Sequence, residues 1–207
     1  MSQAEITLGG GAADHLGAER PFSIPTKKLA IWLFIISDTM TFAACLVAYL
    51  FLRNGTPNWP TPFHSITNVA IMTFILVTSS LTMLLGIRDA QMGNKSAALR
   101  WIYMTALLGL VFALLHIREW ISLIGEGMKM FSNPWGSGLF GACFFSITGL
   151  HLLHVTGGVL ALIFVAVRFN HGRYNSEDVE VVGLYWHFVD LVWMFVVPLV
   201  YLLNLSR

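Results

Sequence analysis

Hydrophobic residues gather in five long runs along the chain, and short polar stretches separate these runs. The runs cover residues 29–52, 65–87, 99–124, 138–167 and 181–203. Each is long enough for an α-helix that crosses the hydrocarbon core of a bilayer, which takes roughly 20 apolar residues. The connections carry turn formers, as in NGTPNWPTP and FSNPWGSG. The pattern therefore predicts an all-α, polytopic integral membrane protein with five transmembrane helices.

The composition agrees with this pattern. Hydrophobic residues make up 56% of the chain and charged residues only 11%, which is typical of a protein embedded in the bilayer. The formal net charge is +1, which gives no reason to expect nucleic acid as a partner. Residues 1–28 are polar and glycine-rich and are expected to form a flexible cytoplasmic tail. Residues 29–207 are expected to form a single five-helix domain whose first span acts as the insertion signal.

The basic residues predict the orientation of the chain. Lys and Arg collect in the cytoplasmic segments of membrane proteins. Eight of the twelve lie in segments on one side: Arg20, Lys27, Lys28, Arg88, Lys95, Arg100, Arg168 and Arg173. The other four lie on the opposite side: Arg53, Arg118, Lys129 and Arg207. This distribution predicts that the N-terminus is inside and the C-terminus outside.

One acidic residue, Asp38, lies within the first run, in the stretch FIISDTMTFA. At 1.5 Å per residue it is about 15 Å beyond Lys28, near the membrane centre, and its short side chain cannot reach the surface. A charged group at this depth costs at least a few kcal/mol, so it needs a partner or a task. Two interpretations stay open: a functional carboxyl that exchanges a proton or links two helices, and a protonated aspartate with a purely structural role.

Three polar pairs stand three positions apart in the later runs: His116 with Glu119, His151 with His154, and His187 with Asp190. Residues at this spacing share one face of a helix. Each pair can therefore bond internally or reach one neighbouring helix together. We expect structural polar pairs. Proton transfer is the alternative for His187 with Asp190. Glu119 is expected to bond either to Arg118 or to a partner loop.

Histidines inside the membrane are also compatible with haem binding, because membrane cytochromes ligate iron with imidazoles on facing helices. His116 and His151 have similar predicted depths, about 25 Å from the inner ends of their helices, and His154 with His187 is a second combination. Satisfied polar packing explains the same residues. The sequence has no cysteine-rich metal motif, phosphate loop or nucleophile elbow. These residues alone do not name a reaction.

The order of four motifs resembles that of subunit III of the haem-copper oxidases. WLFIISDTMTFA is similar to the segment of that family that carries an intramembrane glutamate, and LGLVFALLHIREW to its segment ending in a glutamine, a glutamate and a tyrosine. TGLHLLHVTGG resembles its paired-histidine segment, and YWHFVDLVWMFVVPLVYL its last helix. This chain departs from the family pattern at three positions: Asp38 stands for the glutamate, His116 for the glutamine and Trp120 for the tyrosine.

The resemblance implies an accessory, non-catalytic subunit of a proton-pumping respiratory oxidase that reduces oxygen to water. It implies that this chain holds no cofactor or metal and that haem and copper lie in partner subunits. The implied partners are catalytic subunit I, other oxidase subunits and phospholipids, with a respiratory supercomplex as a larger assembly. The implied location is the inner membrane of a bacterium.

The resemblance also implies roles for particular residues. Asp38 would be a buried carboxyl that faces a lipid cleft or a partner helix and supports proton uptake. Arg168, His171 and Arg173 would contact lipid headgroups, although an ordinary positively charged inner loop explains them equally well. Two rival functions stay open: a haem-binding anchor of an electron-transfer complex, and a similar subunit of a quinol oxidase or nitric oxide reductase.

Overall fold

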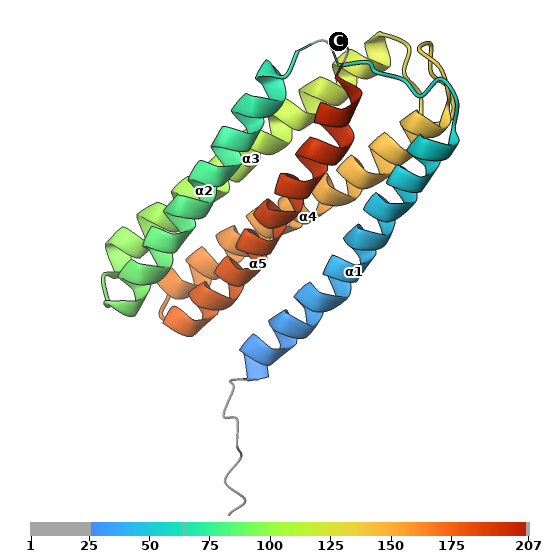
Figure 1. Cartoon of the computed structure of the whole chain (residues 1–207). Coiled ribbons are helices and arrows are strands. Elements are labelled where there is room, and N and C mark those ends of the chain that lie inside the picture. Colours follow the sequence, from blue (N-terminus) through green and yellow to red (C-terminus); the bar gives the residue numbers. More distant parts are fainter. Residues whose placement is uncertain (1–25, 64, 206–207) are drawn as a thin grey trace, which may run out of the picture.

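Five long helices make up most of the protein. The structure is a computed structural model that describes residues 26–63 and 65–205 (Figure 1). The helices are α1 (Thr26–Gly55), α2 (Thr67–Gln91), α3 (Lys95–Gly125), α4 (Leu139–Asn170) and α5 (Ser176–Val196). The chain continues from α5 through a π-helical turn, Val197–Tyr201, and a 3-10 turn, Leu202–Asn204. Most of the predicted tail, residues 1–25, lies outside the described residues.

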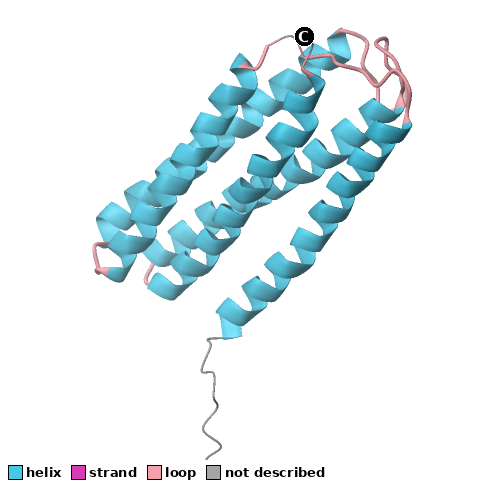
Figure 2. Cartoon of the chain, in the orientation of Figure 1, coloured by secondary structure: helices cyan, strands magenta, loops and turns pink. Residues whose placement is uncertain are grey.

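The predicted fold class is confirmed. The last span runs on from α5 to Asn204, and all five spans are long and apolar enough to cross a membrane. Within the described ranges the backbone forms no strand, only two isolated β-bridges (Figure 2). The π-helical turn contains Pro198, which has no N–H to continue the α-helical pattern.

The helices lie side by side along their length, so the bundle has two ends (Figure 1). We call one the long-loop end, where residues 56–66 join α1 to α2 and residues 126–138 join α3 to α4. We call the other the short-loop end, where residues 92–94 and 171–175 make the connections and where α1 begins.

Trp186 projects from α5 and lies among three other helices, which shows that α5 is at the centre of the bundle. The indole is fully buried, and its Nε1–H donates a hydrogen bond to Ser79 Oγ on α2 at 3.0 Å. Its ring fits against Gly109 of α3 and Gly158 of α4, where any larger residue would meet the indole. Two glycines therefore make the space for one large side chain.

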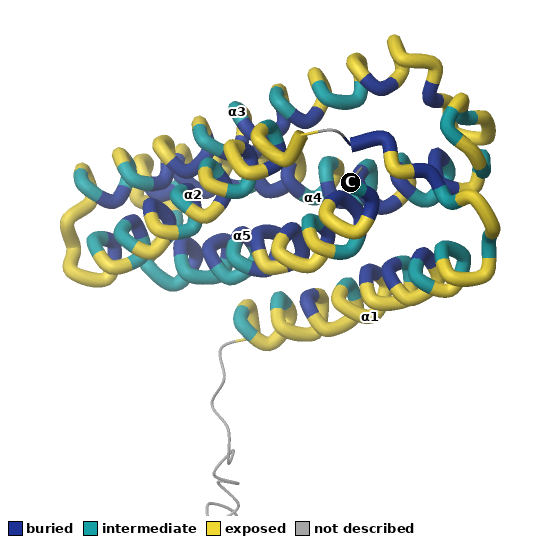
Figure 3. The backbone as a smooth tube through the Cα atoms, turned by 45° about the horizontal axis from the view of Figure 1, so that its top comes forward, coloured by how far each residue is buried: buried dark blue, intermediate teal, exposed yellow. Residues whose placement is uncertain are grey.

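Helix α1 lies at the edge of the bundle and is exposed along most of its outer side (Figure 3). At the short-loop end, Lys27 Nζ is 2.5 Å from Asp178 Oδ1, at the start of α5. At the long-loop end, Arg53 donates to the carbonyl of Leu203 at 2.8 Å and to the side chain of Asn204 at 3.3 Å. Polar contacts thus attach both ends of α1 to the last span.

Gly109→Ala tests the close approach of Trp186. The new Cβ would overlap the indole, so we expect overpacking to cost about 1–3 kcal/mol and to lower the thermal unfolding midpoint of the purified protein. Gly157→Ala is the matched control, because its Cβ would meet only the Tyr185 hydroxyl, at 3.9 Å. Equal midpoints for the two variants would contradict the packing described here.

Candidate functional site

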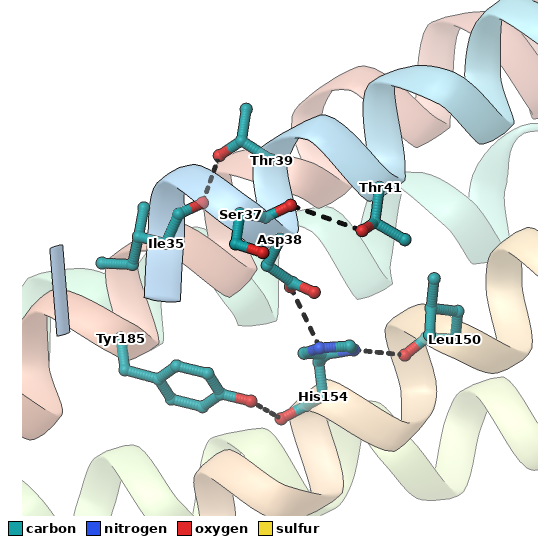
Figure 4. Close-up of polar contacts among 8 residues, drawn as sticks. All are labelled: Ile35, Ser37, Asp38, Thr39, Thr41, Leu150, His154 and Tyr185. Carbon is teal, nitrogen blue, oxygen red and sulfur yellow. Dashed lines mark hydrogen bonds and ion pairs between the residues drawn. The ribbon is translucent and has the colours of Figure 1, made fainter. Parts of the chain in front are cut away.

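Asp38 of α1 faces His154 of α4 near the middle of the bundle (Figure 4). Asp38 Oδ2 lies 3.0 Å from His154 Nε2, a hydrogen-bonding distance, although the angle at this contact is less favourable than in an ideal hydrogen bond. The two side chains are only 15% and 12% exposed. The intramembrane carboxyl therefore has a partner within the same chain, which the sequence analysis did not identify.

The surroundings of His154 fix the orientation of its ring. Its Nδ1 lies 2.7 Å from the carbonyl of Leu150, and because a carbonyl only accepts, Nδ1 carries a hydrogen. The opposite nitrogen, Nε2, then faces Asp38. The carboxyl and the imidazole thus form a contact between two titratable side chains inside the bundle.

Two further contacts hold the imidazole in place. Phe42 of α1 packs edge-on against the His154 ring, with ring centroids 5.3 Å apart. The Tyr185 hydroxyl of α5 donates to the backbone carbonyl of His154 at 3.0 Å (Figure 4). The hydroxyl groups of Thr39 and Thr41, which flank Asp38, donate to their own helix and leave the carboxyl to the histidine.

His187 and Asp190 of α5 both turn toward Ser80 of α2. Ser80 Oγ donates to Asp190 Oδ2 at 2.5 Å, and His187 Nδ1 lies 3.1 Å from the same hydroxyl. The sequence analysis paired these two residues by their spacing and did not identify the serine as their common partner. The serine joins α2 to α5.

His116 and Glu119 of α3 are not brought together. The His116 ring is fully buried among aromatic rings, including those of Phe112 and Trp193. Glu119 instead accepts hydrogen bonds from Tyr201 at 2.7 Å and from the Asn68 amide at 3.2 Å. The structure thus gives the glutamate partners on two other helical segments.

His151 and His154 also have different neighbours. The fully buried His151 ring stacks on Trp193, with centroids 5.1 Å apart, while His154 faces α1. Positions three apart differ by about 60° around a helix of 3.6 residues per turn. In a tightly packed bundle that angle is enough to point two side chains at different helices.

Aromatic side chains lie beside two of the histidines that the sequence analysis considered for haem. His116 and His151 contact the same two buried rings, Phe112 and Trp193, whose centroids are 4.9 Å apart, so aromatic side chains occupy the space beside them. His154 and His187 bond to different partners, Asp38 and Ser80. Among the residues that the structure describes, no group of three or more histidine, cysteine or carboxylate side chains is arranged to hold a metal ion.

The three basic residues proposed for lipid headgroups lie at the short-loop end. The Arg168 guanidinium lies 5.2 Å from the centroid of the Phe164 ring. His171 and Arg173 follow at the end of α4, and both are exposed. Close by, an apolar groove of about 560 Å³ runs between α1, α4 and α5, with Lys27 and Asp178 among its lining residues.

These observations define the class of protein: a polytopic helical membrane protein whose helices are joined by buried polar contacts, such as those of Ser79 and Ser80 with α5. The family model of cytochrome c oxidase subunit III matches residues 12–204. The chain belongs to that family, which confirms the resemblance seen in the motifs. Membership implies a complex with other oxidase subunits.

Individual relatives agree with the family match. Cytochrome c oxidase subunit 3 of Alkalihalophilus pseudofirmus is 34% identical over 87% of this chain and 88% of the relative. The probable cytochrome c oxidase subunit 3 of Mycobacterium tuberculosis is 34% identical over 99% of this chain and all of the relative. Quinol oxidase subunit 3 of Bacillus spizizenii is 29% identical over 94% of this chain and 98% of the relative.

Substitutions of Asp38 test its contact with His154. In Asp38→Asn the amide can donate to Nε2 of His154, so we expect the complex to assemble fully. Asp38→Leu leaves Nε2 of the imidazole without a polar partner, while Nδ1 keeps the Leu150 carbonyl, and we expect a cost of about 1–3 kcal/mol. Yield of intact complex and thermal midpoint measure both effects. Loss of the complex in Asp38→Asn would show that the carboxylate itself is required for assembly.

Ser80→Ala tests the contact between α2 and α5. The variant removes the donor to Asp190 and the partner of His187, and we expect a loss of about 1–3 kcal/mol in stability. Thr78→Ala is the control, because the Thr78 hydroxyl is exposed and donates only to the Phe74 carbonyl of its own helix. The control should change stability by less than about 0.5 kcal/mol. An unaffected Ser80→Ala protein would rule out a stabilising role for this contact.

Proposed function

We propose that this chain is the accessory, non-catalytic subunit III of a respiratory haem-copper oxidase in the inner membrane of a bacterium. The observation that carries the proposal is the family match over residues 12–204. The proposed partners are the catalytic subunit I and phospholipids, and haem and copper belong to the partner subunits. The geometry supports this division, because the intramembrane histidines pack against aromatic rings, a carboxyl or a hydroxyl.

The proposed orientation has the short-loop end at the cytoplasmic face. Seven basic residues of the described chain lie at or near that end: Lys27, Lys28, Arg88, Lys95, Arg100, Arg168 and Arg173. Only Arg53, Arg118 and Lys129 lie toward the long-loop end. Because positive charge is retained on the cytoplasmic side, this asymmetry supports an inside N-terminus and an outside C-terminus.

Asp38 and His154 are the proposed contribution to proton uptake. The two side chains lie between α1 and α4, close to the exposed side of the bundle, where α1 buries few residues. A group that holds a proton without a large structural change can exchange it with a neighbouring water or carboxyl. The other polar pairs are proposed to be structural: His116, Glu119, His151, His187 and Asp190.

The groove between α1, α4 and α5 is the proposed site for phospholipid. Its walls are mostly apolar, with Phe34, Ala161 and Phe164 among them, and Lys27 lies at its rim. Arg168 is beside it, on the Phe164 ring. Apolar walls next to basic side chains match an acyl chain and its phosphate. His171 and Arg173 complete the proposed headgroup region.

A second candidate keeps the same role but changes the electron donor. The similarity to quinol oxidase subunit 3 of Bacillus spizizenii is the observation that favours it. Oxidation of reduced cytochrome c or of a quinol by the purified complex distinguishes the two donors.

Purification of the complex from its own membranes tests the proposal. After extraction in mild detergent, we expect reduced-minus-oxidised spectra and metal analysis to place haem and copper with larger co-purifying subunits. The separated 23.0 kDa chain should be colourless. Haem retained by the separated chain would make it a cytochrome anchor and overturn the proposal.

A further inference from the structure

A second groove lies at the long-loop end, far from the proposed lipid site. It has a volume of about 450 Å³ and lies between α3 and the start of α4. Trp120 and Ile124 of α3 and Phe145 of α4 line it, together with three residues of the connection, Met128, Lys129 and Met130. Lys129 is the one charged residue in this set, so the groove is an apolar trough with an ammonium group.

The wall formed by Trp120 is held rigidly. Its indole Nε1–H donates to Thr148 Oγ1 on α4 at 3.2 Å, and the ring of Phe145 packs edge-on against it with centroids 5.2 Å apart. The indole also lies close to Gly149, where a Cβ would be 3.1 Å from it. These three contacts preserve the groove, because the indole cannot easily rotate into it.

The connection between α3 and α4 forms the rest of the groove. Met128 is fully buried, and the N–H of Lys129 donates to the carbonyl of Ser132 at 2.7 Å, which closes a tight turn. The turn exposes Met130 and Phe131, the latter 81% exposed. A loop with an exposed phenylalanine beside an apolar groove needs a partner other than water.

The groove continues the surface that α3 presents to the bilayer. Ile121 and Ile124 on this side of α3 are 65% and 53% exposed, and Ile124 belongs to both the helix surface and the groove. An acyl chain that lies along α3 can therefore enter without crossing a polar barrier. The nearby acid Glu126 lines a different, polar pocket together with Arg118.

We propose that this groove binds one acyl chain of a phospholipid from the leaflet at the long-loop end, with the Lys129 ammonium on its phosphate. The apolar walls favour hydrocarbon, and a lysine ammonium is a strong point-charge partner for phosphate. A free phosphate would use the ammonium alone and gain nothing from the indole, isoleucine and methionine walls. The site is independent of the groove at the short-loop end and of the role proposed for the chain.

Photolabelling of the assembled complex tests the site. The complex is placed in nanodiscs of phosphatidylcholine in which a fraction of the lipid carries a diazirine on one acyl chain, and labelled peptides are mapped after irradiation. We expect more labelling at Ile124, Met130 and Phe145 than at Phe74, an exposed residue of α2. Equal labelling at all four positions would mean ordinary bilayer contact and would overturn the proposal.

Two matched variants test the walls. Ile124→Trp fills the groove from an exposed position, and we expect labelling at Met130 and Phe145 to fall about tenfold, the equivalent of about 1.4 kcal/mol of binding. Ile121→Trp makes the same change on the same helix at a residue outside the groove lining and should leave that labelling unchanged. An unaffected Ile124→Trp complex would refute the site.

Lys129 variants test the phosphate contact. Lys129→Gln should lower labelling of the groove, while Lys129→Arg should retain it and Lys95→Gln, at the opposite end of the bundle, should not affect it. Equal labelling in all three variants would show that the groove does not recognise phosphate through Lys129, and it would contradict the proposal. Groove peptides labelled only after the other subunits are removed would show that a protein segment fills the groove, which would also contradict it.

Discussion

Two indole N–H groups in the interior of the helix bundle impose the main constraint on its packing. Trp186 and Trp193 project from α5, and each donates to a hydroxyl of α2, Ser79 at 3.0 Å and Thr73 at 3.1 Å. A polar group without a partner is costly in hydrocarbon. The two bonds therefore fix both the depth and the rotation of α5 against α2, and glycines of α3 and α4 admit the Trp186 ring.

Helix α1 depends on a different kind of contact. It buries few side chains and is attached by polar contacts at its two ends and by Asp38 and His154 near its middle. Exposed ion pairs contribute little, but a pair excluded from water contributes more because the alternative is an unpaired buried group. The contact between Asp38 and His154 therefore connects the proposed chemistry directly to the position of α1.

The helical spacing rule indicated which polar groups share a helix face but did not identify their partners. His187 and Asp190 both meet Ser80, as two residues on one face can. His151 and His154 diverge, and Glu119 bonds to Asn68 and Tyr201. The rule gives the direction of a side chain within about 60° around its own helix, whereas the identity of a partner depends on which helix packs there.

The sequence by itself determined the five spans, the asymmetry of basic residues and the family, because hydrophobic length, charge placement and motif order are properties of the chain alone. Tertiary structure decided which polar groups meet. Asp38 and His154 are far apart in sequence, and only the packing of α1 against α4 places them 3.0 Å apart. The groove beside Trp120 likewise exists only because α3, α4 and their connection meet around an indole that Thr148 and Gly149 hold in place.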